Sequence, residues 1–153
     1  MKIGLVTDSL ANLTFDALLD TAAGLGIAGV ELNTCNWSTA PHCDLGELVA
    51  SAAARRSLAG AVAERGLDLY ALNANGNQLH PVDGDRQMRN LLDTITLAAE
   101  LGVPTVVCMS GLPGGAPGDV TPNWVTTSWP PETQGILRWQ WDEQLLPAWH
   151  RIA

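Results

Sequence analysis

The chain has 153 residues, 46% of them hydrophobic and 16% charged, a composition typical of one soluble globular domain with a sizeable core. The formal net charge is −8, with only eight lysine and arginine residues. This charge argues against nucleic acid or an acidic membrane surface as a partner, because both require clustered positive charge. No apolar run reaches the roughly 18 residues of a membrane-spanning helix. The three cysteines provide no disulfide framework, so we expect a cytoplasmic protein.

Four short apolar segments alternate with four longer segments of helical periodicity. The short segments predict strands and the longer ones predict helices. Gly66 and Gly102 each close a helical segment just before an apolar run, which is the usual helix-to-strand junction of parallel α/β folds. In chain order we predict strand 2–7, helix 14–24, strand 28–32, helix 44–65, strand 67–73, helix 83–101, strand 104–110 and helix 133–153.

These four β–α units predict a parallel sheet in chain order, with right-handed crossovers. Nearly every position of each strand is apolar, as in strands that are covered on both faces. A doubly wound sheet and a piece of a barrel both satisfy this pattern. The segment TDSLANLTF after the first strand lacks the glycines of a dinucleotide fold. A complete (β/α)8 barrel needs about 250 residues, so this chain carries about half the units.

The loops that follow the predicted strands are long, and the loops that precede them are short. In parallel α/β folds the functional residues lie at the carboxyl ends of the strands. One of the long loops contains NANGNQLHP, residues 73–81, with three asparagines, a glutamine and one histidine. Uncharged amides can orient the hydroxyl groups of a polyol, but asparagine and glycine also favour turns. Both interpretations stand at this stage.

Three segments resemble a known family. They are ALNANGNQLHP (71–81), SGLPGGAPGDVTPNWVTTSWPPE (110–132) and ILRWQWDEQLLPAW (136–149). The chain resembles the N-terminal half of a sugar phosphate isomerase/epimerase of the xylose-isomerase-like TIM-barrel superfamily. Asn75 stands where many relatives have histidine, and Gln78 where they have proline. The first departure argues against a second imidazole in this loop.

The resemblance implies an α/β fold that is half of a (β/α)8 TIM barrel, with four parallel βα units and helices on one side. Residues 1–153 would form a single N-terminal half-barrel domain, with the C-terminal half absent from this chain. The implied reaction is sugar isomerisation or epimerisation by metal-assisted proton transfer next to a carbonyl. The implied divalent metal (Mn, Mg, Co or Zn) would be held by Glu, Asp, His and Glu at strands five to eight, which have no counterpart here.

The expected partners are a small-molecule sugar or polyol and either a second copy or the missing C-terminal half. We therefore expect the isolated chain to be inactive. The alternatives are a non-catalytic fragment or assembly module and an abasic-site endonuclease. Three histidines and the negative charge argue against the endonuclease, which requires a histidine-rich zinc site and a basic DNA-binding face.

His80 and Glu31 are the predicted catalytic residues. His80 would bond a sugar oxygen or exchange a proton, or else bond a backbone carbonyl of its own loop. Glu31 would accept a hydroxyl proton, or else bond neighbouring backbone amides. We predict no metal ligand, because the spacing of Cys35, His42 and Cys43 matches no common zinc site. The predicted substrate-binding residues, with turn formation, helix capping or loop packing as alternative roles, are Asn73, Asn75, Asn77, Trp37, Trp124 and Asp8.

Overall fold

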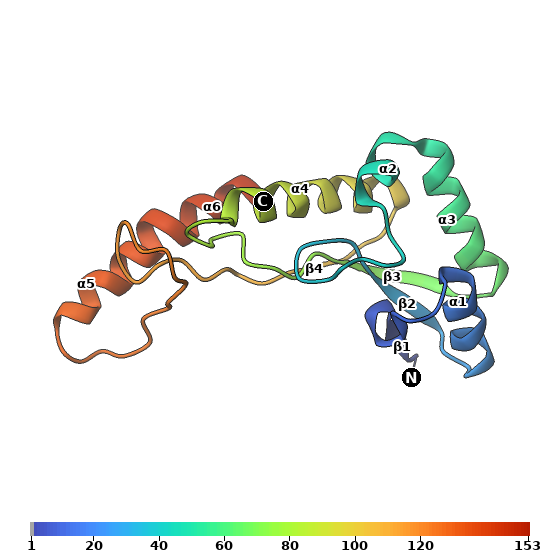
Figure 1. Cartoon of the computed structure of the whole chain (residues 1–153), viewed down its shortest axis with the longest axis horizontal. Coiled ribbons are helices and arrows are strands. Elements are labelled where there is room, and N and C mark those ends of the chain that lie inside the picture. Colours follow the sequence, from blue (N-terminus) through green and yellow to red (C-terminus); the bar gives the residue numbers. More distant parts are fainter. Residues whose placement is uncertain (1) are drawn as a thin grey trace. The chain divides into compact units, whose positions relative to one another are not determined.

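A computed structural model describes residues 2–153, in which strands and helices alternate in the predicted order (Figure 1). None of the helices in these residues is both long and apolar enough to cross a bilayer. The elements are β1 (Gly4–Val6), the 3-10 helix η1 (Thr7–Leu10), α1 (Phe15–Gly24), β2 (Gly29–Asn33), α2 (Leu45–Ala50), α3 (Ala52–Glu64), β3 (Asp68–Asn73), α4 (Gly84–Leu101), β4 (Val106–Val107), α5 (Glu132–Trp139), the π-helix η2 (Gln140–Leu145) and α6 (Leu146–Ile152).

The chain divides into two compact units. The sheet unit comprises the chain up to Asn75 together with Asp93–Cys108. The helical unit comprises Gly76–Leu92 and Met109–Ala153. The expectation of a single half-barrel domain over 1–153 stays a prediction.

The sheet unit contains all four strands. They form one sheet in the order β1-β2-β3-β4, and every neighbouring pair is parallel, which confirms the predicted topology. Within residues 2–153, β1 and β4 are the edge strands. Strand β4 contains only Val106 and Val107, whereas the sequence predicts 104–110. Pro104 has no N–H for the hydrogen-bond ladder, which is one reason for the late start.

One face of the sheet carries the hydrophobic core, as alternation along a strand requires. A register shift after Val30 leaves Tyr70 as an extra residue in β3, so that Leu69 pairs with Val30 but Ala71 pairs with Glu31. The shift keeps Leu69 and Leu72 on the core side and places Ala71 and Asn73 on the other side. The strand residues that belong to the core clusters or pack against them are Leu5, Val30, Leu32, Leu69, Leu72 and Val106.

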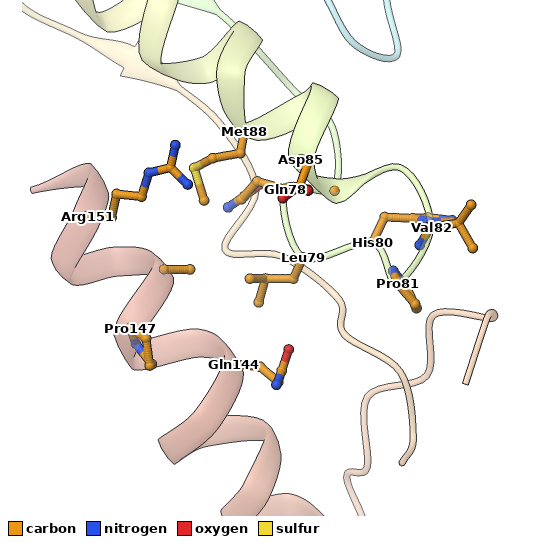
Figure 2. Close-up of a pocket in the computed structure, with 12 residues that line it drawn as sticks. Gln78, Leu79, His80, Pro81, Val82, Asp85, Met88, Gln144, Pro147 and Arg151 are labelled. Carbon is orange, nitrogen blue, oxygen red and sulfur yellow. The ribbon is translucent and has the colours of Figure 1, made fainter. Parts of the chain in front are cut away.

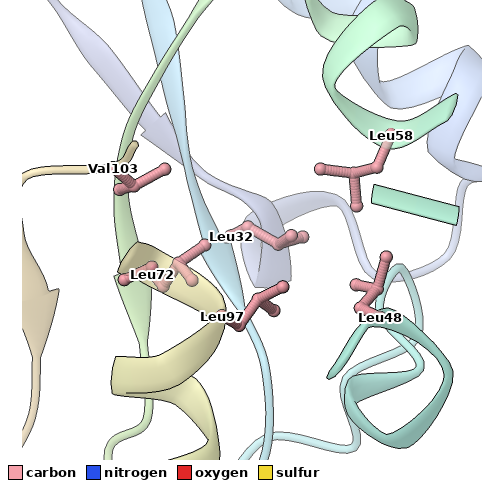
Figure 3. Packing of buried hydrophobic residues seen from close by; sticks show 7 residues of the cluster. Leu32, Leu48, Leu58, Leu72, Leu97 and Val103 are labelled. Atoms are coloured by element: carbon pink, nitrogen blue, oxygen red, sulfur yellow. The ribbon is translucent and has the colours of Figure 1, made fainter. Parts of the chain in front are cut away.

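Helices α1, α2 and α3 and residues 93–101 of α4, which belong to the sheet unit, cover this one face, as predicted for these segments. Leu18, Leu19 and Ala22 of α1 pack with Val30 and with Val62 of α3. A second cluster joins Leu32 and Leu72 to side chains of α2, α3 and α4. Figure 3 shows two of its members, Leu48 and Leu58, pointing toward one another; the full cluster is Leu32, Leu48, Leu58, Leu72, Leu97, Ala98 and Val103.

Local signals set most helix ends. The Thr14 side chain accepts a hydrogen bond from the Ala17 backbone N–H at 3.3 Å and so caps the N-terminus of α1. Gly66 and Gly102 have positive φ angles of 67° and 68°, as C-terminal glycines do. The helix predicted over 44–65 is instead two helices, because Ser51 is extended and caps α3.

Candidate functional site

Four of the predicted residues lie in one hydrogen-bonded series in the sheet unit. Asn73 Nδ2 donates to Glu31 Oε1 at 2.6 Å. Asn73 Oδ1 accepts the backbone N–H of Asn75 at 2.8 Å, and the Asn75 carbonyl accepts the backbone N–H of Trp37 at 3.0 Å. The series joins the carboxyl ends of β2 and β3 to the two loops that follow them. We call these four residues the strand-end site.

The strand-end site holds Glu31 in one orientation. Glu31 lies on the sheet face opposite the helices, because its neighbours Val30 and Leu32 belong to the core. Asn73 is 5% exposed, and its two amide atoms have different partners, so its donor side must face Glu31. Glu31 itself is partly exposed, and its second oxygen, Oε2, makes no hydrogen bond within residues 2–153. One carboxylate oxygen is therefore held by Asn73, while the other makes no hydrogen bond to the described residues.

Trp37 is exposed at the surface and follows a residue in the left-handed backbone conformation. Its side chain is 59% exposed. The preceding residue, Asn36, has a φ of +64° and donates its side-chain amide to the Ala74 carbonyl at 3.1 Å. Asparagine tolerates this left-handed conformation better than most residues. The hydrogen bonds on both sides of the turn fix the backbone beneath an exposed indole ring.

Asp8 lies in η1, directly after β1, in the sheet unit. Its Oδ1 atom is buried and makes no hydrogen bond within residues 2–153. The alternative role as a cap of the next helix does not apply, because Thr14 caps α1. A buried carboxylate oxygen without a partner is costly, so Asp8 is a candidate for contact with a group outside these residues.

Two predicted residues of the helical unit have structural partners. Asn77 is 2% exposed, and its amide donates to the Leu112 carbonyl at 2.8 Å and accepts the Leu112 N–H at 2.7 Å. The Asn77 amide thus binds both backbone polar groups of Leu112. These two hydrogen bonds explain an asparagine at this position without a ligand. The Trp124 ring packs edge-to-face on Trp141, with centroids 5.8 Å apart.

His80 stabilises the turn before α4. Its Nδ1 atom accepts the backbone N–H of Val82 at 3.1 Å and that of Asp83 at 3.2 Å. Its carbonyl accepts the Gly84 N–H at 2.8 Å. A hydrogen bond from Arg86 lowers the pKa of the Asp83 carboxyl. The imidazole therefore bonds backbone N–H groups, whereas the sequence-based alternative was a backbone carbonyl.

A cavity of about 420 Å³ lies beside His80 in the helical unit (Figure 2). Figure 2 shows the His80 ring next to Val82, on the side of the loop away from α6. Sequence reasoning missed the opposite wall, which α6 and η2 supply. The spacing of Gln144, Pro147 and Arg151 places them on one helix face, and that periodicity was the available signal.

The residues that the structure describes do not form a metal site. Among residues 2–153, no group of three or more histidine, cysteine, aspartate or glutamate side chains has the geometry to hold a metal ion. Burial raises the pKa of the Cys43 thiol to about 12, which opposes the thiolate form that binds zinc. The metal implied by the resemblance therefore does not fit this part of the barrel, and its ligands stay a proposal.

Comparison with known proteins finds a relative that is longer than this chain. The chain is 44% identical over 156 residues to the uncharacterized protein YfiH of Bacillus subtilis (strain 168); the match covers 100% of this chain and 50% of YfiH. The chain thus spans about half the length of the curated relative that it matches. No protein-family model matches the sequence.

Two solved structures are similar. The probable 3-DHS dehydratase AsbF, involved in petrobactin synthesis in Bacillus anthracis, has a TM-score of 0.52 and 18% identity over 78% of this chain and 42% of AsbF. A xylose isomerase domain protein from Alicyclobacillus acidocaldarius subsp. acidocaldarius has a TM-score of 0.45 and 22% identity, covering 69% of this chain and 35% of that protein. The likeness to AsbF supports the fold that the sequence predicts, an α/β half of a TIM barrel.

Proposed function

We propose that this chain is the N-terminal half of a sugar or sugar phosphate isomerase/epimerase. The observation that carries the proposal is the strand-end site, in which Glu31, Asn73, Asn75 and Trp37 are joined by hydrogen bonds at the carboxyl ends of β2 and β3. In barrels of parallel strands this end forms the active site. The site offers a carboxylate, neutral amides and an aromatic face, which are the groups that bind polyols without charge.

Each residue has a definite role in this proposal. Glu31, held by Asn73 through Oε1, uses Oε2 to accept a proton from a substrate hydroxyl or from the carbon next to a carbonyl. The Asn75 side chain, which makes no hydrogen bond within residues 2–153, binds a hydroxyl group. Trp37 covers the C–H face of the sugar and excludes water. Asp8 contributes its unpartnered oxygen to a second hydroxyl group.

The metal would come from the other half of the barrel. When bound, a divalent ion would polarise the carbonyl oxygens of the substrate. Residues 2–153 contain no cluster of side chains that could hold the ion, so its ligands would lie in that other half. Their contribution is substrate orientation and proton transfer.

The free sheet edges suggest where the second half joins. Within residues 2–153, β1 and β4 each pair with a strand on one side only, and Ile3 and Val6 are 55% and 38% exposed. Unpaired edges with apolar side chains favour pairing with further strands. The twofold greater length of YfiH favours a continuation of the same chain as the partner. Without it, we expect the 153-residue chain to self-associate and to lack activity.

Sedimentation of the 153-residue chain tests the assembly. Val6→Lys places a charge on the β1 edge and should reduce self-association, whereas Thr39→Lys, on an exposed loop of the sheet unit, should not. A wild-type chain that sediments as a monomer at all concentrations would contradict the proposed edge pairing.

The chemistry is tested by measuring turnover in the proposed longer protein, in which this chain continues into the second half of the barrel. We call it the longer protein. It should be assayed with added Mn²⁺, Mg²⁺, Co²⁺ or Zn²⁺ on a panel of aldoses, ketoses and their phosphates. Glu31→Gln should reduce kcat by about 10²- to 10⁴-fold, the usual contribution of general acid–base catalysis. Glu47→Gln, an exposed carboxylate in α2, is the matched control. Full activity of Glu31→Gln would refute the assigned role. The panel should include 3-DHS, because AsbF is a probable 3-DHS dehydratase.

A further inference from the structure

The hydrogen bonds of His80 determine which ring nitrogen carries the proton. Nδ1 accepts two backbone N–H groups, those of Val82 and Asp83, at 3.1 and 3.2 Å. A nitrogen that accepts hydrogen bonds carries no hydrogen, so the neutral ring must carry its single proton on Nε2. The two contacts are local, to residues two and three positions along the chain in the turn before α4.

Nε2 is the free end of the ring. It makes no hydrogen bond within residues 2–153, and His80 is partly exposed. The Asp83 carboxyl of the same turn lies close enough to interact electrostatically with the ring, and Arg86 donates to this carboxyl at 2.8 Å. Arg86, in the first turn of α4, donates to both oxygens of the Asp83 carboxylate.

The geometry points to His80 as a fixed neutral hydrogen-bond donor, through Nε2–H, to an oxygen atom of a bound ligand. A general base needs a free lone pair, and the only lone pair of this tautomer is engaged by the Val82 and Asp83 N–H groups. A neutral imidazole can instead polarise a carbonyl or hydroxyl oxygen. This inference rests on the proposed function for the identity of the ligand. It differs from the expectation that His80 exchanges a proton.

The tautomer is measurable without substrate. A long-range ¹⁵N–¹H correlation spectrum of the 153-residue chain at a pH where the ring is neutral should show Nδ1 in the unprotonated range and Nε2 in the protonated range. The reverse assignment, or an equal mixture of tautomers, would overturn the inference. Because this spectrum needs no turnover, it gives an answer even if the longer protein has no activity on any sugar and the proposed function fails.

Two variants separate the two nitrogens. In His80→Asn, the side-chain oxygen of the shorter residue can accept hydrogen bonds in the position of Nδ1. In His80→Gln, the side-chain nitrogen of the longer residue can donate in the position of Nε2. Amide exchange at Val82 and Asp83 should stay within about threefold of wild type in His80→Asn and become about tenfold faster in His80→Gln. The kcat of the longer protein should follow the opposite order, with a loss of about 10²-fold in His80→Asn and a smaller loss in His80→Gln.

The decisive result is that amide exchange changes more in His80→Gln while kcat falls more in His80→Asn. A structural role for His80 alone would make exchange and kcat change in parallel. A kcat for His80→Asn within twofold of wild type would overturn the donor role.

Discussion

Gln140 provides the sharpest test of how the long loop after β4 is held. Its side chain is 0% exposed and lies in η2, within the helical unit. Nε2 donates to the carbonyls of Gly114 and Asn123 at 2.8 and 2.6 Å, and Oε1 accepts the Val125 N–H at 3.0 Å. One amide thus binds three backbone groups of the 111–131 loop. Gln140→Met removes all three hydrogen bonds and keeps the length of the side chain.

The expected loss follows from the burial of the three partners. The Gly114 carbonyl is buried and would lose this donor without access to water, which costs about 1–3 kcal/mol. The Asn123 and Val125 groups are partly accessible and can turn to water, so each hydrogen bond costs about 0.5–1 kcal/mol. The apolar methionine side chain recovers part of the loss by burial. We expect the free energy of unfolding to fall by about 2–4 kcal/mol.

Urea unfolding followed by tryptophan fluorescence measures this loss. Five of the six tryptophans belong to the helical unit, since Trp37 alone lies in the sheet unit, so the signal reports mainly the unit that carries the substitution. Gln134→Met is the matched control, because Gln134 is exposed and its amide donates to the Ser128 carbonyl of the same loop at 3.3 Å. The control should change stability by less than about 0.5 kcal/mol. A Gln140→Met variant as stable as this control would refute the reasoning.

Burial raises the pKa of the Cys43 thiol from 9.0 to about 12. The native state keeps this proton between pH 9 and 12 while the unfolded chain loses it, so the free energy of unfolding should fall by up to about 1.4 kcal/mol per pH unit there. Urea titrations at successive pH values should show this slope and its loss in Cys43→Ala; an unchanged slope would exclude the thiol as its source. Asn77→Ala should lower the free energy of unfolding in urea by about 2–4 kcal/mol, because the buried Asn77 side chain loses its two hydrogen bonds to Leu112 of the loop after β4. Asn75→Ala should change it by less than about 0.5 kcal/mol, and equal effects of the two variants would contradict this assignment. Gly29→Ala would place a methyl group 2.4 Å from the Asp68 carbonyl oxygen, so thermal unfolding should show a loss of about 1–3 kcal/mol, and an unchanged Tm would refute the predicted clash.

The sequence predicts the order and type of the elements well because their signals are local. Thr14 binds an N–H three residues away, and Gly66 and Gly102 need only their own backbone conformation. The parallel order of the strands follows from the βα alternation and the rule on crossovers. The break at Ser51 was missed because it depends on a longer contact: Arg55 donates to the Leu48 and Val49 carbonyls at the end of α2.

The sequence predicts which residues belong to the candidate site, but it does not predict which of them contact one another. Glu31 and Asn73 come at the ends of apolar runs, which places them toward the carboxyl ends of their strands, and the Asn73–Asn75 turn is a local asparagine motif. The same amide chemistry suits sugar binding and structural pairing equally, so composition alone does not separate Asn77 from Asn75. Only the contacts do: Asn77 binds Leu112, 35 residues away, and the Asn75 side chain binds no described residue.

By itself, the sequence determined the periodicity of helices and strands, their caps, and the end of the sheet at which polar groups gather, because each depends on neighbours within one turn or on strand alternation. Tertiary structure decided which of those groups meet. The extra residue at Tyr70 shifts the register of β3 and places Asn73 on the same face as Glu31, 42 residues earlier. The conformation of each segment in isolation does not specify such a pairing; it is selected when the apolar side chains of both strands pack on one core.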